Sequence, residues 1–300
     1  MLLVDQGLYI GTVADLNDSQ ALTDAAVTHV LSVDSVDPTP LLPPSAKICN
    51  KWINVLDVET SDLLSYMDIC FLFLREAVDM GGAALVHCQA GRSRSATIVT
   101  AYLMKKYQLS FPEAYHRLMV VKKDVAVNRG FEEQLCLYEA MQCQVDTCDP
   151  LYKQYRLTKI AEKYPNDLHC VLSDIFAVDP AQSNSSDVSY RCRKCRTTLF
   201  CSSNILSHLV GNGSVSFGHK KSSNLTGDAV CTSYFIEPVQ WMEQAMLGVM
   251  DGQLLCPKCR SKLGSFRWYG DQCSCGRWVT PAFQLHRNRV DEIRQLKIQK

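Results

Sequence analysis

The sequence predicts an α/β domain in the first half of the chain and a smaller, metal-built domain in the second half. Three observations support this prediction. Strand-like and helix-like segments alternate through the first half, which is the pattern of an α/β layer fold. Closely spaced pairs of cysteines occur in the second half. The chain of 300 residues is also long enough for two domains.

The strand-like segments of the first half are short runs rich in β-branched and other apolar residues. We expect strands at 7–11, 27–33, 52–56 and 83–87. The helix-like segments carry apolar residues at a period near 3.6 residues. They predict helices at 16–26, 63–80, 94–106, 110–122 and 130–142.

A further helix is expected immediately after this half. Asp149 and Pro150 form an N-cap and first-turn signature for a helix that reaches about Lys163. Cations repeat along this helix at near-helical spacing, at Lys153, Arg156, Lys159 and Lys163. Such a row is typical of a solvated helix face or, alternatively, of a contact with an acidic surface.

The polar run 182–187 predicts a linker. We therefore expect a catalytic domain at 1–148, a helical connector and linker at 149–189, and a metal-binding domain at 190–300. The charge differs between the two halves of the chain. The first 149 residues carry 11 basic and 19 acidic residues, a net charge of −8, and the remainder carries 20 and 12, a net charge of +8.

Composition narrows the classes of protein that fit. With 47% apolar and 21% charged residues, the chain resembles an ordinary globular protein. No apolar run approaches the ~20 residues that span a bilayer, and the start lacks secretory features, so we expect an intracellular protein without a membrane partner. In a reducing compartment, its 15 cysteines indicate metal binding or catalysis. The basic half can indicate an anionic partner such as RNA, although metal-bound thiolates would offset part of that charge.

The segment from His87 to Ser95 lies between a predicted buried strand and a predicted helix. A helix N-terminus offers unpaired amide N–H groups and a partial positive charge, which together bind anions. A cysteine at that point, Cys88, is stabilised as the thiolate, which is the nucleophilic form of the side chain. The five residues between Cys88 and Arg94 allow the loop to curl around a tetrahedral anion.

The amides of this loop would line the anion site, at Gln89, Ala90, Gly91, Arg92 and Ser93. Arg94 would hold two phosphate oxygens in a bidentate fork and stabilise charge on the transferred phosphoryl group. Gly91 permits a turn where a side chain would clash. Ser95 can donate a hydrogen bond to Cys88 and assist it as a leaving group. The loop therefore predicts hydrolysis of phosphate esters through a phosphocysteine intermediate.

This reaction also needs a proton for the leaving oxygen. A carboxylic acid on a nearby loop can supply it and then act as a base on the hydrolytic water. Asp57, just after the strand expected at 52–56, is the candidate. Glu59 and Asp62 are close enough in the sequence to compete for this role.

Two cysteine pairs in the second half have the Cys-x2-Cys spacing of zinc knuckles, Cys192 with Cys195 and Cys256 with Cys259. Each pair binds one side of a metal ion, and two pairs complete a tetrahedral Zn²⁺ site. Cys201 would be a fifth ligand, so we leave it out. A site with four protein ligands and no open position is structural, and a domain built around it should unfold without metal.

Cys273 and Cys275 form a third close pair, which needs two further ligands. Cys231 and His208 are the best remaining candidates, which would give a second structural zinc. His219 and His286 are rivals to His208.

Four stretches of the first half resemble a dual-specificity phosphatase domain, at 7–11, around Asp57, at 87–95 and at 128–131. The resemblance implies a central sheet flanked by helices, a general acid at Asp57 and catalysis without a cofactor. It also implies a shallow cleft that admits phosphoserine and phosphothreonine as well as phosphotyrosine. Nothing upstream resembles a kinase-docking domain, so the chain resembles an atypical member of the family.

The second half resembles the zinc-binding domain of one subgroup of these phosphatases, at 235–241, 252–259 and 273–278. The resemblance implies two zinc ions in a small domain, which we expect to be mostly β. It also implies a link to late maturation of the large ribosomal subunit and shuttling between nucleus and cytoplasm. We therefore expect phosphoprotein substrates and, alternatively, a ribosome-assembly role in which the zinc domain binds preribosomal particles.

Overall fold

The structure is a computed structural model that describes residues 1–38, 41, 48–163, 175–180, 188–208, 211 and 231–294. Its contacts divide the chain into two compact units, Met1–Asp146 (unit 1) and Thr147–Lys300 (unit 2). The linker expected at 182–187 lies outside the described residues. None of the described helices has the length and apolar character needed to cross a membrane.

Unit 1 is built on a five-stranded sheet with the strand order β1-β2-β5-β3-β4. Its strands are β1 (Leu2–Asp5), β2 (Leu8–Thr12), β3 (Val27–Val33), β4 (Cys49–Ile53) and β5 (Ala83–Cys88). β1 is antiparallel to β2, and the other neighbouring strands are parallel. The central strand β5 is buried along its whole length, because a parallel sheet is covered on both faces.

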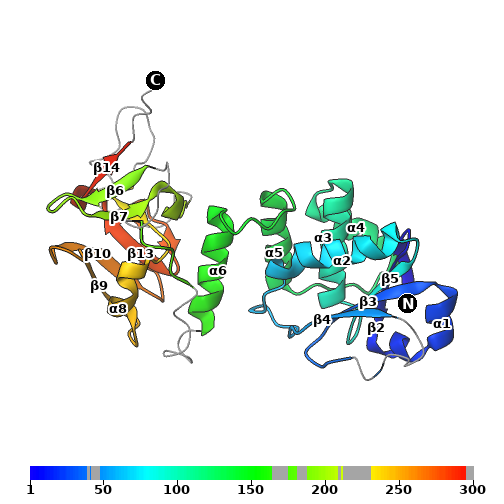
Figure 1. Ribbon diagram of the computed structural model, residues 1–300. Coiled ribbons are helices and arrows are strands. Elements are labelled where there is room, and N and C mark those ends of the chain that lie inside the picture. The colour runs from blue at the N-terminus through cyan, green and yellow to red at the C-terminus, as the bar shows by residue number, and fades with distance from the viewer. Residues whose placement is uncertain are drawn as a thin grey trace. The chain divides into compact units, whose positions relative to one another are not determined.

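Helices cover both faces of this sheet. They are α1 (Ser19–Asp24), α2 (Met67–Asp79), α3 (Arg94–Tyr107), α4 (Phe111–Val121) and α5 (Arg129–Ala140), with 3-10 turns η1 (Val13–Asn17) and η3 (Leu64–Tyr66). Helices α2 to α5 lie together on one side of the sheet (Figure 1). On the other side, Leu16 and Leu22 pack against Val30 and Leu85. The expected α/β fold, a central sheet flanked by helices, is therefore confirmed.

Three expected elements of unit 1 differ from their bounds, and β1 was not expected at all. The helix expected at 63–80 is divided into η3 and α2. The strand expected at 52–56 is β4, which ends at Ile53 because the chain then turns towards the loop after β3, where the amide of Val55 donates to the carbonyl of Asp34 at 3.4 Å. The helix expected at 16–26 is divided into η1 and α1. Asp18 ends the first and caps the second, since its side chain accepts the amide of Ala21 at 2.9 Å.

The parallel strands β3 and β5 bring two chemically important segments to the same edge of the sheet. Their carboxyl ends lie side by side, with Ser32 opposite His87 in register. Asp34 follows directly after β3, and Cys88 is the last residue of β5. Ligand sites of open parallel sheets form at this edge, outside the carboxyl ends of the strands.

Unit 2 contains three small sheets among its described residues, with strand orders β8-β13-β10-β9, β14-β6-β7 and β11-β12. The strands are β6 (Ser189–Cys192), β7 (Thr198–Cys201), β8 (Ser233–Phe235), β9 (Asp251–Leu255), β10 (Lys262–Arg267), β11 (Asp271–Gln272), β12 (Trp278–Val279), β13 (Ala282–His286) and β14 (Val290–Ile293). Its helices are α6 (Pro150–Lys163) and α8 (Glu243–Met246), with 3-10 turns η6 (Ser202–Asn204), η7 (Gln240–Met242) and η8 (Arg287–Arg289). Apart from α6, this unit is mostly β, as expected.

Helix α6 is part of unit 2 by its contacts. Leu157 is buried in the core of that unit, in one cluster with Leu254 and Phe266. The ammonium group of Lys153 lies 2.8 Å from Glu237 Oε1 and 2.9 Å from the carbonyl of Ser203. The first cation of the row on α6 is therefore used inside the unit, in a contact that fixes the helix to the sheet region.

Candidate active site

The loop from Cys88 to Arg94 joins the end of β5 to the start of α3. Cys88 is 1% exposed, and its Sγ atom lies 3.2 Å from Ser95 Oγ. The amide of Gly91 also donates to Cys88 Sγ at 3.2 Å. Two hydrogen-bonding groups therefore surround the sulfur at a helix N-terminus, where negative charge is stabilised.

Close packing explains the glycine in this loop. Gly91 has φ +68°, and a Cβ atom added there would lie 2.6 Å from the carbonyl oxygen of Gly11 on β2. Gln89, Ala90 and Arg92 have exposed side chains, whereas Ser93 is buried. The guanidinium of Arg92 points away from the loop, since its Nε donates to the carbonyl of Asp124 at 2.8 Å.

Arg94 is buried, with two carboxylates beside its guanidinium. Its NH1 atom donates to Asp34 Oδ1 at 2.8 Å and to the carbonyl of Val55 at 3.2 Å. Its Nε atom is buried without a hydrogen-bond partner among the described residues. That atom lies 3.7 Å from Asp57 Oδ2. The Nε side of the guanidinium is therefore the side that is left for an anion.

Asp57, the candidate acid, lies beside the loop residue Ser93. Its Oδ1 atom accepts hydrogen bonds from Ser93 Oγ at 2.7 Å and from Asn128 Nδ2 at 2.9 Å. The competitors have other surroundings. Asp62 accepts the amide and hydroxyl of Ser65 at the start of η3, at 3.1 and 2.6 Å. Glu59 is exposed.

Gly130 allows the segment around Asp57 to approach α5. A Cβ atom at Gly130 would lie 2.1 Å from the carbonyl oxygen of Glu59, so any other residue there would push the segment away. Asn128, two residues earlier, caps α5 because its Oδ1 accepts the amide of Phe131 at 3.0 Å. The stretch 128–131 therefore fixes Asp57 by packing and by a hydrogen bond.

His87 supports the loop from inside the sheet. It is fully buried, and its Nε2 lies 2.7 Å from Ser32 Oγ on the neighbouring strand. Burial lowers the pKa of His87, and nearby Arg94 acts in the same direction, while the backbone of Cys88 and the carboxylates of Asp34 and Asp15 oppose it. The ring is consequently neutral at pH 7 and holds β5 to β3 by a hydrogen bond.

Sequence reasoning missed Asp34 and assigned no role to Asn128. Nothing in the residues around Asp34 distinguishes it from other acids of the chain. Its position directly after a predicted parallel strand is the signal that could have found it, because side chains at carboxyl ends of neighbouring strands converge. For Asn128, the signal is the N-cap position before a predicted helix.

Two groups of side chains in unit 2 could hold a metal ion, among the residues that the structure describes. One consists of Cys192, Cys195, Cys256 and Cys259, and the other of His208, Cys231, Cys273 and Cys275. In each group the ligand atoms lie within 4.8 Å of one another. These are the two sets that the sequence predicts.

The first set fits a tetrahedral ion. Cys192 Sγ lies 3.8 Å from Cys259 Sγ, and Cys195 Sγ lies 3.5 Å from Cys256 Sγ. Four sulfurs around a tetrahedral Zn²⁺ with ~2.3 Å bonds would be ~3.8 Å apart. Hydrogen bonding with the side chain and backbone of Thr197 lowers the pKa of Cys195 to about 6, whereas burial raises the pKa of its neighbour Cys256 to about 12.

The second set includes His208, whose Nε2 lies 3.5 Å from Cys231 Sγ. The rival His286 is engaged elsewhere, with its Nδ1 3.1 Å from Ser233 Oγ. The other rival, His219, lies outside the described residues. Cys201 is a member of neither set in the described part of the chain.

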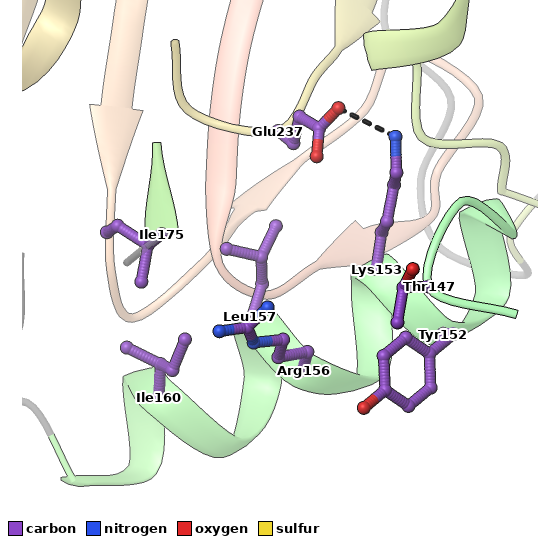
Figure 2. A pocket seen from close by; sticks show the side chains of 8 residues that line it. All are labelled: Thr147, Tyr152, Lys153, Arg156, Leu157, Ile160, Ile175 and Glu237. Carbon is purple, nitrogen blue, oxygen red and sulfur yellow. Dashed lines mark hydrogen bonds and ion pairs between the residues drawn. The ribbon is translucent and has the colours of Figure 1, made fainter. Parts of the chain in front are cut away.

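Unit 2 also has a small cavity beside α6 (Figure 2), lined by Thr147, Tyr152, Lys153, Arg156, Leu157, Ile160, Ile175 and Glu237. Its volume is about 60 Å³, well below the ~300 Å³ of a site for a small molecule. The ion pair of Lys153 with Glu237 lies among the lining side chains. The cavity is a packing gap and does not offer a substrate site.

The chain is similar to known proteins. A model of the dual specificity phosphatase catalytic domain matches residues 8–141. The chain is 52% identical to human dual specificity protein phosphatase 12, in an alignment that covers 99% of this chain and 90% of that protein. It is 32% identical to tyrosine-protein phosphatase YVH1 of Saccharomyces cerevisiae, covering 96% of this chain and 90% of that protein. The crystal structure of human DUSP28 is 32% identical, covers 48% of this chain and 100% of its own, and has a TM-score of 0.44.

The alignment with human dual specificity protein phosphatase 12 includes both units, because it extends over nearly the whole chain. Cys88, the loop that follows it and Asp57 lie together in unit 1, within the matched residues 8–141. The chain therefore belongs to the dual specificity phosphatase family, as a relative of dual specificity protein phosphatase 12.

Proposed function

We propose that this protein phosphatase hydrolyses phosphotyrosine and phosphoserine or phosphothreonine in proteins through a phosphocysteine intermediate at Cys88. The observation that supports the proposal most directly is that a buried sulfur and a guanidinium nitrogen without a hydrogen-bond partner in the described part of the chain meet a carboxylic acid from another segment at one loop. Cys88 Sγ is 3.2 Å from Ser95 Oγ, and Arg94 Nε is 3.7 Å from Asp57 Oδ2.

In the first step, the Cys88 thiolate attacks phosphorus, and the bond from phosphorus to the leaving oxygen breaks. Asp57 donates a proton to that oxygen. Because Oδ1 already accepts two hydrogen bonds, the proton is carried on Oδ2, the oxygen nearer Arg94. The loop amides and Arg94 stabilise the charge of the transferred phosphoryl group.

In the second step, water attacks the phosphocysteine, and Asp57 accepts its proton. The bond from sulfur to phosphorus breaks and releases inorganic phosphate. Ser95 Oγ is close enough to Cys88 Sγ to donate a hydrogen bond to the departing thiolate. The acid is thus restored for the next turnover, and no cofactor takes part in either step.

The loop itself favours protein substrates. Gln89 and Ala90 add no cation to the anion site, and the exposed Arg92 bonds to the backbone at Asp124. A polyanionic headgroup such as an inositol phosphate would require additional positive charge here. A single phosphate ester on a peptide needs only the loop amides and Arg94.

Turnover of an aryl phosphate by the full-length protein tests the mechanism. Wild type should turn over, and Cys88→Ser should be inactive while keeping its fold. Peptides with phosphotyrosine, phosphoserine and phosphothreonine at one position then measure the specificity. A folded wild-type protein that cleaves none of them would refute the proposal, and so would Cys88→Ser with wild-type activity.

We propose that both metal-binding sets hold Zn²⁺ as a structural ion, because cysteine-rich sets with these spacings suit zinc. Each set has four protein ligands and leaves no open position for catalysis. Zinc would supply folding free energy to unit 2. Measuring metal content of the purified protein tests this, with two zinc ions per chain expected.

A second candidate function is partner binding by unit 2, with large-subunit preribosomal particles as the partner and a distribution between nucleus and cytoplasm. The cations around the first metal set favour it, because Arg193, Lys194, Arg196, Lys258 and Arg260 are all exposed. Such a surface suits an anionic partner. Full-length protein with Lys194 and Lys258 changed to Glu should lose co-sedimentation with these particles. A matched reversal of Arg75 and Lys123 in unit 1 should not, and equal sedimentation of both variants would refute this function.

A further inference from the structure

Asp34 is a buried carboxylate in the active site that the mechanism above does not use. It is 5% exposed and follows β3 directly. Its backbone amide donates to the carbonyl of Ile53 at 3.2 Å, and its carbonyl accepts Trp52 Nε1 at 2.8 Å. Its Oδ1 accepts the amide of Ser35 at 2.7 Å. The position of this carboxylate is therefore fixed from both the backbone and the side chain.

Arg94 divides its donors between this carboxylate and the anion site. A guanidinium has five N–H donors, two of them on NH1. Both NH1 contacts go to fixed acceptors, Asp34 Oδ1 at 2.8 Å and the carbonyl of Val55 at 3.2 Å. A bidentate grip on phosphate requires two parallel N–H bonds from one edge of the guanidinium. With NH1 occupied, the edge formed by Nε and NH2 is the one that remains.

We propose that Asp34 is a positioning residue of this phosphatase: it holds NH1 of Arg94 so that the Nε and NH2 edge meets the phosphate. The inference rests on the proposed phosphocysteine mechanism and adds a residue to it. Asp34 acts through Arg94 and does not touch the substrate. Removal of its carboxylate should therefore leave the guanidinium of Arg94 in the site but misplaced.

Asp34 affects phosphate binding in two ways that can be separated, by the repulsion of its charge and by the positioning of Arg94. A carboxylate next to the anion site repels a phosphate dianion, so by itself it weakens binding. A buried guanidinium without a counterion is also costly in the empty enzyme. The charge of Asp34 thus weakens phosphate binding, while its hydrogen bond fixes the guanidinium of Arg94. A neutral variant that keeps an oxygen acceptor for Arg94 NH1 should therefore bind phosphate more tightly, and a neutral variant without that acceptor should bind it more weakly.

The test compares Asp34→Asn with Asp34→Ala, both neutral, in the full-length protein. Asparagine keeps an oxygen that can accept from NH1, and alanine does not. In a Cys88→Ser background, titration calorimetry with inorganic phosphate should show about threefold tighter binding for Asp34→Asn than for Cys88→Ser alone. Binding by Asp34→Ala should be at least about tenfold weaker than by Asp34→Asn. Equal affinities for the two neutral variants would overturn the proposal.

Turnover gives a second, independent readout. With Cys88 intact, Asp34→Ala should lower kcat/KM for an aryl phosphate about 100-fold, because small misplacements of binding groups have effects of this size. Asp34→Asn should remain within about tenfold of wild type. In an Arg94→Ala background, Asp34→Ala should produce no further loss, since the two residues act as one unit. A full additional loss there would show that Asp34 acts by another route.

Asp68 provides a matched control. It is a partly buried carboxylate of unit 1 that bonds to Lys105 and Tyr138, away from the loop. Asp68→Ala should lower the melting temperature and leave kcat/KM unchanged. If Asp34→Ala does not fold, Asp34→Glu, which keeps the charge but moves the oxygens by one methylene, should show the loss of turnover in its place. Two results together would refute the mechanism and leave the positioning role standing. The wild-type protein would be inactive, and phosphate would still bind more weakly to Asp34→Ala than to Asp34→Asn.

Discussion

Asn128 donates a hydrogen bond from Nδ2 to Asp57 Oδ1 at 2.9 Å, and its own Oδ1 accepts the amide of Phe131 at 3.0 Å. The second bond fixes which end of the amide faces Asp57, because the oxygen is committed to capping α5. The cap of a helix therefore orients the candidate general acid. Ser93 adds a second bond to the same carboxylate oxygen, at 2.7 Å, so two side chains hold this oxygen of the acid.

We predict that Asn128→Ala lowers kcat mainly for substrates with poor leaving groups. An alkyl phosphate needs the proton of Asp57 in the transition state, whereas an aryl phosphate with an acidic phenol needs it little. Because general acids contribute about 100-fold or more, misplacement of Asp57 should cost roughly tenfold on the poor leaving group. Rates for a series of phosphates with leaving groups of different pKa check this.

The exposed neighbour Arg129 supplies the control for this prediction. It bonds to Glu133 on the surface of α5, so Arg129→Ala should leave the leaving-group dependence unchanged. If Asn128→Ala slows all leaving groups equally and also lowers the melting temperature, the residue is a helix cap without a part in orienting the acid.

The contact of Ser95 with Cys88 predicts a change of rate-limiting step. Ser95 Oγ lies 3.2 Å from Cys88 Sγ, and its hydrogen bond stabilises the thiolate as it leaves phosphorus. In Ser95→Ala, breakdown of the phosphocysteine should slow about 100-fold, as for loss of a hydrogen bond made to charge that develops in the transition state. Rapid-quench kinetics should then show a burst of phenol close to one per enzyme. A slow, burst-free reaction would place the effect of Ser95 on the first step.

Removal of metal should unfold unit 2 and leave unit 1 folded. Both metal sets lie in unit 2, whereas Cys88, Arg94 and Asp57 lie in unit 1. A strong chelator should therefore unfold unit 2, lower the far-ultraviolet signal and leave turnover of an aryl phosphate nearly unchanged. Cys256→Ser and Cys231→Ser should each lose one of two metal ions. Complete loss of turnover on chelation would mean that folding of unit 1 depends on unit 2.

The parts of the fold that sequence could predict are those that local pattern determines. The helices α3, α4 and α5 begin and end within two residues of expectation, because capping residues and apolar period specify them locally. The end of β4 was misplaced by three residues, since the contact that pulls Val55 out of the sheet is made with Asp34, which is far away in sequence. Such long-range contacts leave no local pattern.

The active site divides in the same way. Cys88, Arg94 and Ser95 share one loop, so their spacing alone predicts that they meet. Asp34 reaches Arg94 only because β3 and β5 are neighbours in the sheet, and sequence does not give this adjacency. The second metal set was predictable by its chemistry, since Cys273 and Cys275, the third close cysteine pair of the chain, needed two further ligands.

The buried His87 predicts a pH dependence for the stability of unit 1. Burial lowers the pKa of His87 in the folded protein, whereas the unfolded chain binds a proton near pH 6.5. At pH values above this, both states are neutral at His87 and stability is complete. As the pH falls below about 6.5, the unfolded state binds more protons, so the free energy of unfolding decreases by up to about 1.4 kcal/mol per pH unit.

Native-state hydrogen exchange of the β5 amides between pH 7.5 and 5.0 measures this unfolding free energy in unit 1. His87→Gln, which cannot titrate, should have a flatter profile than wild type, and the exposed His116→Asn should keep the wild-type slope. The acids with lowered pKa in this unit cause losses only as the pH falls towards and below about 4, under the measured range, so their effect is separate. They are Asp5, Asp15, Asp68, Glu113 and Asp124. Identical slopes for His87→Gln and wild type would assign the pH dependence to another group.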